Sequence, residues 1–418
     1  MQIQLYQGGF VAKAELIAPA GNLEKLKMAV VYGADAVYIG GEEYSLRAYA
    51  GNFSAEDMKE GIAFAHSRGR KVYLTMNIIP HNRDLDDMRQ YIEEVGEVGV
   101  DAIILSDPGV FSFVKEMLPG MKIHLSTQAN NTNWRSATFW HEHGISRIIL
   151  ARELSLDEIK EIREKAPEEL ELEVFIHGAM CVSYSGRCLL STYMAGRDSN
   201  RGYCAHPCRW KYFLTEEERP GQYMPVFENE RGTFIFNSKD LCMIEHIPEL
   251  MATGVTGLKI EGRMKSSYYV ATVVKAYREA IDAYYKDPDR YAFDMRWLDE
   301  VSKASHREYT TGFYFGRPLG NDRIYGSSSY IREYDFVGLV KAYDPKTGIA
   351  AVEQRNRMRE GDEIEVVRPV GGHFTQKIRE MRNADGEYID VAPHPQMIVY
   401  MPMDFEAAEY SMLRRKID

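Results

Sequence analysis

The chain has 418 residues, 45% of them hydrophobic and 27% charged, and a net charge of -11. This length allows a large core and predicts a second, smaller domain. The negative charge excludes nucleic-acid binding by bulk electrostatic attraction, because phosphate contacts need clustered Lys and Arg.

The N-terminal sequence and the apolar runs indicate a protein without membrane segments. The longest apolar runs are far shorter than the roughly 20 residues that a membrane span requires. The first ten residues lack the basic and apolar regions of a secretory signal. We therefore expect a reducing cytoplasmic location, where disulfides are rare.

Short β-rich runs alternate with amphipathic helical stretches through the first two-thirds of the sequence, which predicts βα units. The expected strands are Glu15–Ala20, Ala36–Gly40, Lys71–Asn77, Ala102–Ser106, Lys122–Thr127, Arg147–Ala151, Leu172–His177 and Gly257–Glu261. Eight units predict a closed (β/α)₈, TIM-like barrel. An open doubly wound sheet is the alternative, but its Gly-rich phosphate loop is missing after the first strand.

A barrel places functional groups at the carboxyl ends of its strands. The polar residues at or just past these ends are Asn77, Asp107, Thr127, Gln128, Arg152, His177, Glu261 and Arg263. Among them we select Arg152, His177, Glu261 and Arg263 as candidate catalytic residues. A structural role is an open alternative for each.

From about Tyr330 the pattern changes to strands only. They are expected at Asp335–Ala342, Gly348–Gln354, Asp362–Pro369, His373–Arg379 and Gln396–Met401. Short strands at this spacing predict a small all-β barrel. We therefore divide the chain into a barrel at 1–325, with a cysteine-rich insertion at about 178–245, and a C-terminal domain at 330–418. The second domain could guide RNA, cover the site or form an oligomer contact.

The cysteines are confined to one zone of the chain. Cys181, Cys188, Cys204 and Cys208 follow the seventh strand, and Cys242 comes 34 residues later. Their spacing matches neither a zinc ribbon nor the ferredoxin runs. Clustered thiols still favour a metal or iron–sulfur site over buried structural cysteines. Zinc, with nitrogen ligands from His177 and His206, stays an alternative.

Basic and aromatic residues are interleaved in the same segment, as a splayed-out RNA base and its phosphates would require. The candidate RNA-binding residues are Arg187, Arg197, Arg201, Tyr203, Arg209, Trp210 and Lys211. The alternative is a solvated loop that shields the cysteines. Hydrolytic motifs are missing, and nothing in the sequence supports a nucleophile–base pair of Cys181 or a nearby serine with His177.

Several longer motifs resemble one known family. They are Glu173-Val-Phe-Ile-His-Gly-Ala-Met-Cys, Asn200-Arg-Gly-Tyr-Cys-Ala-His-Pro-Cys-Arg-Trp, Asn237-Ser-Lys-Asp-Leu-Cys and Leu258-Lys-Ile-Glu-Gly-Arg-Met-Lys-Ser. Together they resemble peptidase family U32 over nearly the whole chain. Despite that name, the resemblance implies hydroxylation of RNA or quinones, and these motifs are most similar to the tRNA branch.

The tRNA branch implies oxygen-independent, prephenate-dependent formation of 5-hydroxyuridine at the wobble position. The quinone branch implies a [4Fe–4S] cluster, with Cys181, Cys188, Cys204 and Cys242 as ligands by motif and Cys208 as an alternate. We expect a prephenate carboxylate to dock on Arg152 or Arg263, since arginine binds both carboxylate oxygens. The tRNA anticodon loop is the expected partner. A collagenase-like peptidase, hydroxylation of a ribosomal RNA cytidine and non-catalytic RNA binding stay alternatives.

Overall fold

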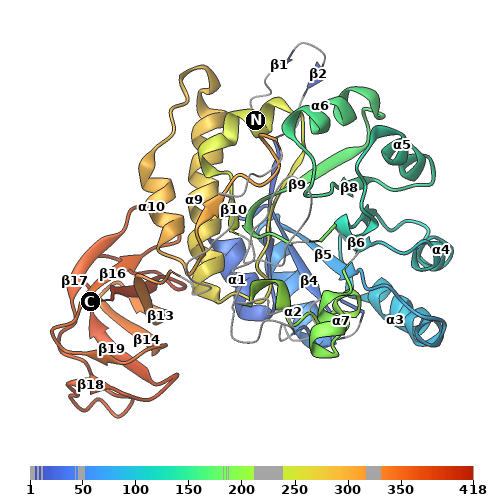
Figure 1. Ribbon diagram of the computed structural model, residues 1–418. Helices are drawn as coiled ribbons and strands as arrows, with labels where there is room; N and C mark the ends of the chain where they lie inside the picture. The colour runs from blue at the N-terminus through green and yellow to red at the C-terminus, as the bar shows by residue number, and fades with distance from the viewer. Residues whose placement is uncertain are drawn as a thin grey trace, which may run out of the picture.

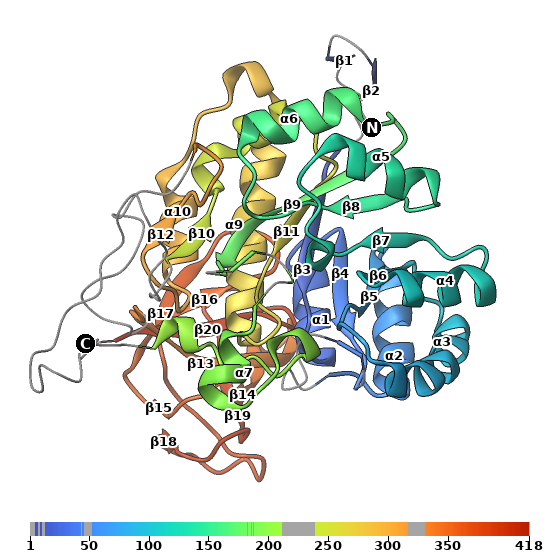
Figure 2. The same ribbon diagram turned by 45° about the vertical axis from the view of Figure 1, so that its right-hand side comes forward.

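We describe a computed structural model of the chain (Figures 1 and 2). It describes residues 5–6, 9–10, 13–42, 44–45, 52–181, 183–184, 186, 188–210, 239–316 and 331–417. Of the candidate residues, Arg187 and Lys211 lie outside this description, as does the side chain of Arg209. In both views the orange-red C-terminal strands pack against one flank of a larger barrel, beside α9 and α10.

Eight parallel strands form the closed barrel that the sequence predicts. They are β3 (Glu15–Pro19), β4 (Ala36–Gly40), β5 (Lys71–Met76), β6 (Ala102–Leu105), β7 (Ile123–Leu125), β8 (Arg147–Ile149), β9 (Glu171–Ala179) and β11 (Gly257–Ile260). The strand β11 pairs in parallel with both β9 and β3, which closes the ring. Strands β4 and β6 are buried along their whole length, as expected where helices cover a parallel sheet. The prediction of a TIM-like barrel is confirmed.

The helices begin at the capping residues that the sequence supplies. Asn22, Ser54 and Ser155 each accept a backbone N–H at the start of a helix, and Ser155 forms a capping box with Glu158. The described helices are α1 (Leu23–Val31), α2 (Ala55–His66), α3 (Leu85–Val98), α4 (Pro108–Met117), α5 (Trp134–Glu142), α6 (Leu156–Lys165), α7 (Leu190–Ala195), α8 (Ile247–Ala252), α9 (Ser267–Lys286) and α10 (Met295–Ser302). Among the described helices, we find no segment with the length and apolar character of a bilayer span.

Two short strands extend the barrel sheet. The strand β10 (Asp240–Cys242) runs antiparallel to β9, and β12 (Tyr309–Thr310) pairs in parallel with β10. Each has only two or three residues and falls outside the eight predicted βα units, in the cysteine-rich insertion or in the connector after α9, so the sequence did not predict them. This extension puts Cys242 directly opposite His177.

The C-terminal part is an antiparallel all-β half-barrel, which confirms its predicted class. Its main sheet has the order β17-β16-β20-β13-β14-β19. The strands are β13 (Tyr334–Asp344), β14 (Ile349–Gln354), β16 (Glu363–Val367), β17 (Phe374–Lys377), β19 (Ile398–Pro402) and β20 (Met412–Lys416), with β15 (Met358–Arg359) and β18 (Val391–Ala392) in a small second sheet. The edge strands are joined by a side chain, because the Gln376 amide donates to the Pro402 carbonyl at 3.1 Å.

A buried polar interface fixes the half-barrel to the barrel. The fully buried Arg414 forms ion pairs with Glu300 at 2.6 Å and with Glu365 at 2.8 Å. The Tyr32 hydroxyl lies 2.9 Å from the carbonyls of Val367 and Tyr410. These bonds compensate for the desolvation of the groups that the interface buries.

Candidate functional site: the barrel mouth and the cysteine cavity

The carboxyl ends of the barrel strands surround a small polar cavity of about 50 Å³, here called the mouth. Its lining comes from seven of the eight barrel strands or the loops after them: Tyr38, Thr75, Asn77, Ile104, Ser126, Thr127, Gln128, Ile149, Arg152, Phe175, Lys259, Glu261 and Arg263. A cavity needs about 10–15 Å³ of such volume to hold one water, so the mouth has room for a group the size of a carboxylate rather than a whole metabolite. Three of the four candidate catalytic residues meet here.

Arg152 lies at the edge of the mouth on the face of an aromatic ring. Its guanidinium carbon is 3.9 Å from the centroid of Phe175, and its Nη2 is 3.3 Å from Glu261 Oε2. Both ionic groups keep some contact with solvent, with side-chain exposures of 12% and 16%. A cation held by one long ion pair and an aromatic face can exchange its carboxylate partner for a ligand's.

Arg263 is buried deeper, at 3% exposure. Its two Nη atoms donate to Thr75 Oγ1 at 2.9 Å, Ser45 Oγ at 3.0 Å and Asn52 Oδ1 at 2.8 Å. These bonds to neutral oxygens orient the guanidinium. Arg263 contributes positive potential to the mouth.

A larger cavity of about 530 Å³, here called the cysteine cavity, adjoins the mouth. Gln128, Arg152 and Glu261 line both spaces, so the two are neighbours across a shared wall. The cysteine cavity is also lined by Cys181, Cys188, Cys204, Cys208, His206 and Lys265. Its volume is within the range of small-molecule sites.

Two glycines let the cysteine segment approach the barrel this closely. Gly178 has φ +106°, and a Cβ there would lie 2.6 Å from the Glu261 carbonyl oxygen. Gly186 has φ +74°, and its Cβ would lie 2.1 Å from the Gln128 carbonyl oxygen. Any larger residue would push the segment away from the mouth.

The cysteine loops are held by side-chain bonds to the backbone. The Cys188 carbonyl accepts from Ser199 Oγ at 2.7 Å and from Asn200 Nδ2 at 3.1 Å. The Ala205 amide donates to Ser191 Oγ at 2.9 Å, next to Cys204. These bonds connect the loops to one another and to α7.

The donor set fits an iron–sulfur cluster in residue type. Four thiols line one cavity, and thiolates are the ligands of such clusters and of zinc. Within the described part of the chain, no three His, Cys, Asp or Glu side chains are close enough together to hold a metal ion. The fit therefore concerns the chemistry of the donors, and ligation would require the loops to draw the thiols together.

Cys242 lies elsewhere. It does not line the cysteine cavity; its Sγ is 3.8 Å from the Tyr277 hydroxyl, and burial raises the pKa of the thiol to about 12. The ligand set implied by the family motif thus has one member outside the cavity, while Cys208, the alternate, lies on its wall.

His177 lies with Cys242 rather than with the mouth. A register shift between Lys259 and Ile260 accompanies its pairing with β11, and its ring packs among Tyr269, Tyr277 and Tyr309. Burial lowers the pKa of His177 to about 3, so the ring is neutral at physiological pH. This environment is that of a packed core histidine.

The described candidate RNA-binding residues differ in how far they are already engaged by the protein. Arg201 makes a two-pronged ion pair with Asp84, and Arg197 Nε donates to the Tyr203 carbonyl at 2.9 Å. The aromatic side chains of Tyr203 and Trp210 are 43% and 45% exposed. Exposed rings remain accessible for base stacking, whereas the Arg201 guanidinium is already engaged.

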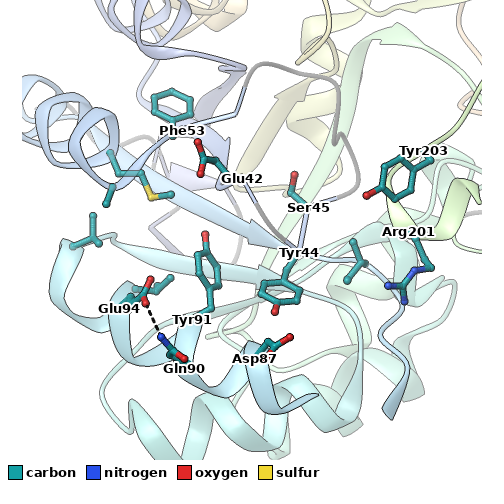
Figure 3. Close-up of a pocket in the computed structure, with 15 residues that line it drawn as sticks. Glu42, Tyr44, Ser45, Phe53, Asp87, Gln90, Tyr91, Glu94, Arg201 and Tyr203 are labelled. Carbon is teal, nitrogen blue, oxygen red and sulfur yellow. Dashed lines mark hydrogen bonds between the residues drawn. The ribbon is translucent and has the colours of Figure 1, made fainter. Parts of the chain in front are cut away.

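The sequence reasoning missed Lys265 and a further cavity. Lys265 contributes a cation to the cysteine cavity from the loop after β11. It follows the candidate catalytic residue Arg263 by two positions in the sequence. The further cavity, of about 580 Å³, lies beside α2 and α3; Figure 3 shows Tyr44 and Tyr91 within it and Arg201 and Tyr203 along one side. Its residues come from distant segments, so no local motif could indicate it.

Comparisons with known proteins identify the family. The model of peptidase family U32 matches residues 21–323, and that of the U32 C-terminal domain matches residues 332–414. The chain is 44% identical to "tRNA hydroxylation protein P1" of Bacillus subtilis, over 96% of this chain and 95% of that protein. It is 41% identical to "tRNA hydroxylation protein P" of Escherichia coli, over 96% and 97%.

A relative with a different name also matches. A protein named "Collagenase" from Porphyromonas gingivalis is 34% identical, over 88% of this chain and 90% of that protein. The chain belongs to peptidase family U32, as its motifs predict.

Proposed function

We propose that this protein hydroxylates tRNA, forming 5-hydroxyuridine at the wobble position by an oxygen-independent route that consumes prephenate. The observation that carries the proposal is the shared wall between the mouth, with its two arginines, and a cavity lined by four cysteines. Relatives named for tRNA hydroxylation, aligned over nearly the whole chain, support the same reaction class.

The cofactor in this proposal is a [4Fe–4S] cluster held by thiolates of the cysteine cavity. Its location favours Cys181, Cys188, Cys204 and Cys208 as the ligand set, with Cys242 as the alternative that the family motif implies. A bound cluster would supply electron transfer for the oxidation of uridine C5. Zinc is the competing occupant.

The chain's own residues bind and orient the reactants. Arg152 and Arg263 would hold a carboxylate of prephenate in the mouth, which has room for that group, and the body of the molecule would extend into the cysteine cavity. Exposed Tyr203 and Trp210 would stack bases of the anticodon loop. Glu261, which lines both cavities, could orient a hydroxyl or a base N–H.

A collagenase-like peptidase is the second candidate, favoured by the name of one relative. It would need a histidine beside a nucleophile. The aromatic cage around His177 keeps that ring off the walls of both cavities. Among the described residues, His206 lines the cysteine cavity, so it is the histidine that such a peptidase would have to use.

The test is nucleoside analysis of tRNA and ribosomal RNA from a bacterial strain that lacks 5-hydroxyuridine, complemented with this chain. We expect wild type to restore 5-hydroxyuridine in tRNA and the Cys204→Ala variant to restore none. Hydroxycytidine in ribosomal RNA, without 5-hydroxyuridine in tRNA, would show that the substrate is ribosomal RNA instead. No modified nucleoside, together with peptide cleavage that survives Cys204→Ala, would overturn the proposal in favour of the peptidase.

A further inference from the structure

One ion pair connects the cysteine segment to the barrel across 117 positions of sequence. Arg201 Nη1 and Nη2 bind the two oxygens of Asp84 at 2.6 and 2.8 Å. Both side chains are partly buried, with exposures of 20% and 13%. A two-pronged pair of this kind fixes orientation as well as distance.

Asp84 is itself held in place. It ends η1 (Asn82–Asp84), immediately before α3, and its Oδ2 accepts the backbone amide of His81 at 2.7 Å. The hydrogen bond from Arg201 contributes most to keeping the pKa of Asp84 below its ordinary range. The carboxylate therefore stays charged, and paired, through the physiological pH range.

The residues around Arg201 connect this ion pair to the positions of Cys188 and Cys204. In η3 (Ser199–Arg201), Ser199 and Asn200 both donate to the Cys188 carbonyl, and the Asn200 carbonyl accepts the amide of Ile79 at 3.0 Å. Cys204 follows Arg201 by three residues. The loop after β5 thus holds the short segment from which both Cys188 and Cys204 are placed.

We propose that Asp84 is a positioning residue for the cysteine cavity, which it keeps in place by binding Arg201. This role differs from the RNA contact that the sequence suggests for Arg201. Figure 3 shows Arg201 beside Tyr203 along one side of the cavity next to α3. The importance of Asp84 for catalysis rests on the proposed function, whereas the test of its positioning role is independent of that function.

The first test uses the metal-free full-length protein under anaerobic, reducing conditions. Iodoacetamide labelling of each cysteine is followed by mass spectrometry in wild type, Asp84→Asn and the matched control Asp87→Asn. A lost charge-assisted pair changes a local opening equilibrium by about tenfold. We expect Cys188 and Cys204 to react about tenfold faster in Asp84→Asn, with wild-type rates in the control.

Buried Cys242 is the internal reference for global unfolding. Unchanged rates at Cys188 and Cys204 in Asp84→Asn would overturn the proposal, and so would an equal acceleration at Cys242. If Asp84→Asn does not fold, Arg201→Lys, which keeps the charge but loses the second prong, gives the same comparison. The exchanged pair Asp84→Arg with Arg201→Asp should restore slow labelling.

A second readout separates this inference from the proposed function. After anaerobic reconstitution with iron and sulfide, the rate of iron loss to a chelator is compared between Asp84→Asn and Asp87→Asn. Faster loss in Asp84→Asn alone supports the positioning role. If wild type binds no iron, the cluster proposal fails while the labelling result still decides the role of Asp84.

Discussion

The two ends of the barrel interior balance their charges in different ways. Towards the amino-terminal ends of the strands, Arg147 binds Glu15 at 2.7 Å, Glu171 at 2.5 Å and Glu173 at 3.3 Å. Lys259, which also lines the mouth, binds Glu173 at 2.6 Å and joins this network. At the mouth, Arg263 donates to neutral oxygens. The first network is satisfied by the protein's own carboxylates, whereas Arg152 and Arg263 line a cavity that a ligand could enter.

This difference teaches which charges serve the fold and which are available to a ligand. Arginines alone would not separate the two, because Arg147 and Arg263 are equally buried, at 2% and 3% exposure. Their partners separate them. The predictions below test this division, from the largest expected effect to the smallest.

Removing Glu173, the carboxylate that binds both Arg147 and Lys259, should destabilise the fold most. Glu173→Gln leaves Arg147 and Lys259 buried with too little negative charge, and breaking a buried pair costs about 3–5 kcal/mol. Glu171→Gln is the matched control, since its side chain is 45% exposed and exposed pairs contribute about 1 kcal/mol or less. Urea denaturation measures both, and similar losses for the two variants would contradict the division.

Changing Arg152 should affect activity more than stability. Losing a charge-assisted contact to a ligand costs about 1.5–3 kcal/mol, so Arg152→Gln should reduce the efficiency with the carboxylate co-substrate by about 10–100-fold. Its unfolding free energy should change by less than about 1 kcal/mol. The control Arg89→Gln removes a surface pair with Glu116. Equal activity of the two variants in tRNA hydroxylation would contradict a ligand role.

The buried imidazole of His177 should make stability depend on pH. Its pKa is lowered to about 3 in the folded protein, from an ordinary 6.5, because burial opposes the charged form. Below pH 6.5 the unfolded chain binds a proton that the folded chain does not, so stability falls by up to about 1.4 kcal/mol per pH unit until pH 3.

The comparison variant is His177→Gln. Its loss of stability between pH 7 and pH 4.5 should be smaller than that of wild type, as measured by urea denaturation at each pH. An identical pH dependence would mean that the ring is not buried as described. Wild type also carries the buried His124, whose lowered pKa acts in the same direction in both proteins.

The sequence predicted the barrel because its strands are buried apolar runs separated by capped helices, even where only three residues are extended, as in β7 and β8. The sequence did not predict the short strands β10 and β12. It also did not predict β20, because the run Met412–Lys416 ends in three basic residues and lacks a clean alternation of apolar and polar residues. Buried Arg414 within β20 depends on Glu300 and Glu365, which are distant in sequence. Local periodicity cannot show such a partner.

The candidate site was predictable only where strand ends determine it. Arg152, Glu261 and Arg263 meet at the mouth because parallel strands deliver their carboxyl ends to one place. His177 shares that position in sequence, but it lies beside a register shift and packs among tyrosines. The role of Asp84 was not predictable, because its partner is far along the chain and the intervening segments carry no shared motif.

The most direct test of the account compares two cysteines. Cys208→Ala and Cys242→Ala are purified anaerobically and reconstituted with iron and sulfide, and metal content and visible spectra are recorded beside wild type. The account predicts near-stoichiometric iron and sulfide in wild type and Cys242→Ala, with loss of the cluster in Cys208→Ala. Loss in Cys242→Ala with retention in Cys208→Ala, or zinc in place of iron throughout, would contradict the cysteine cavity as the cluster site.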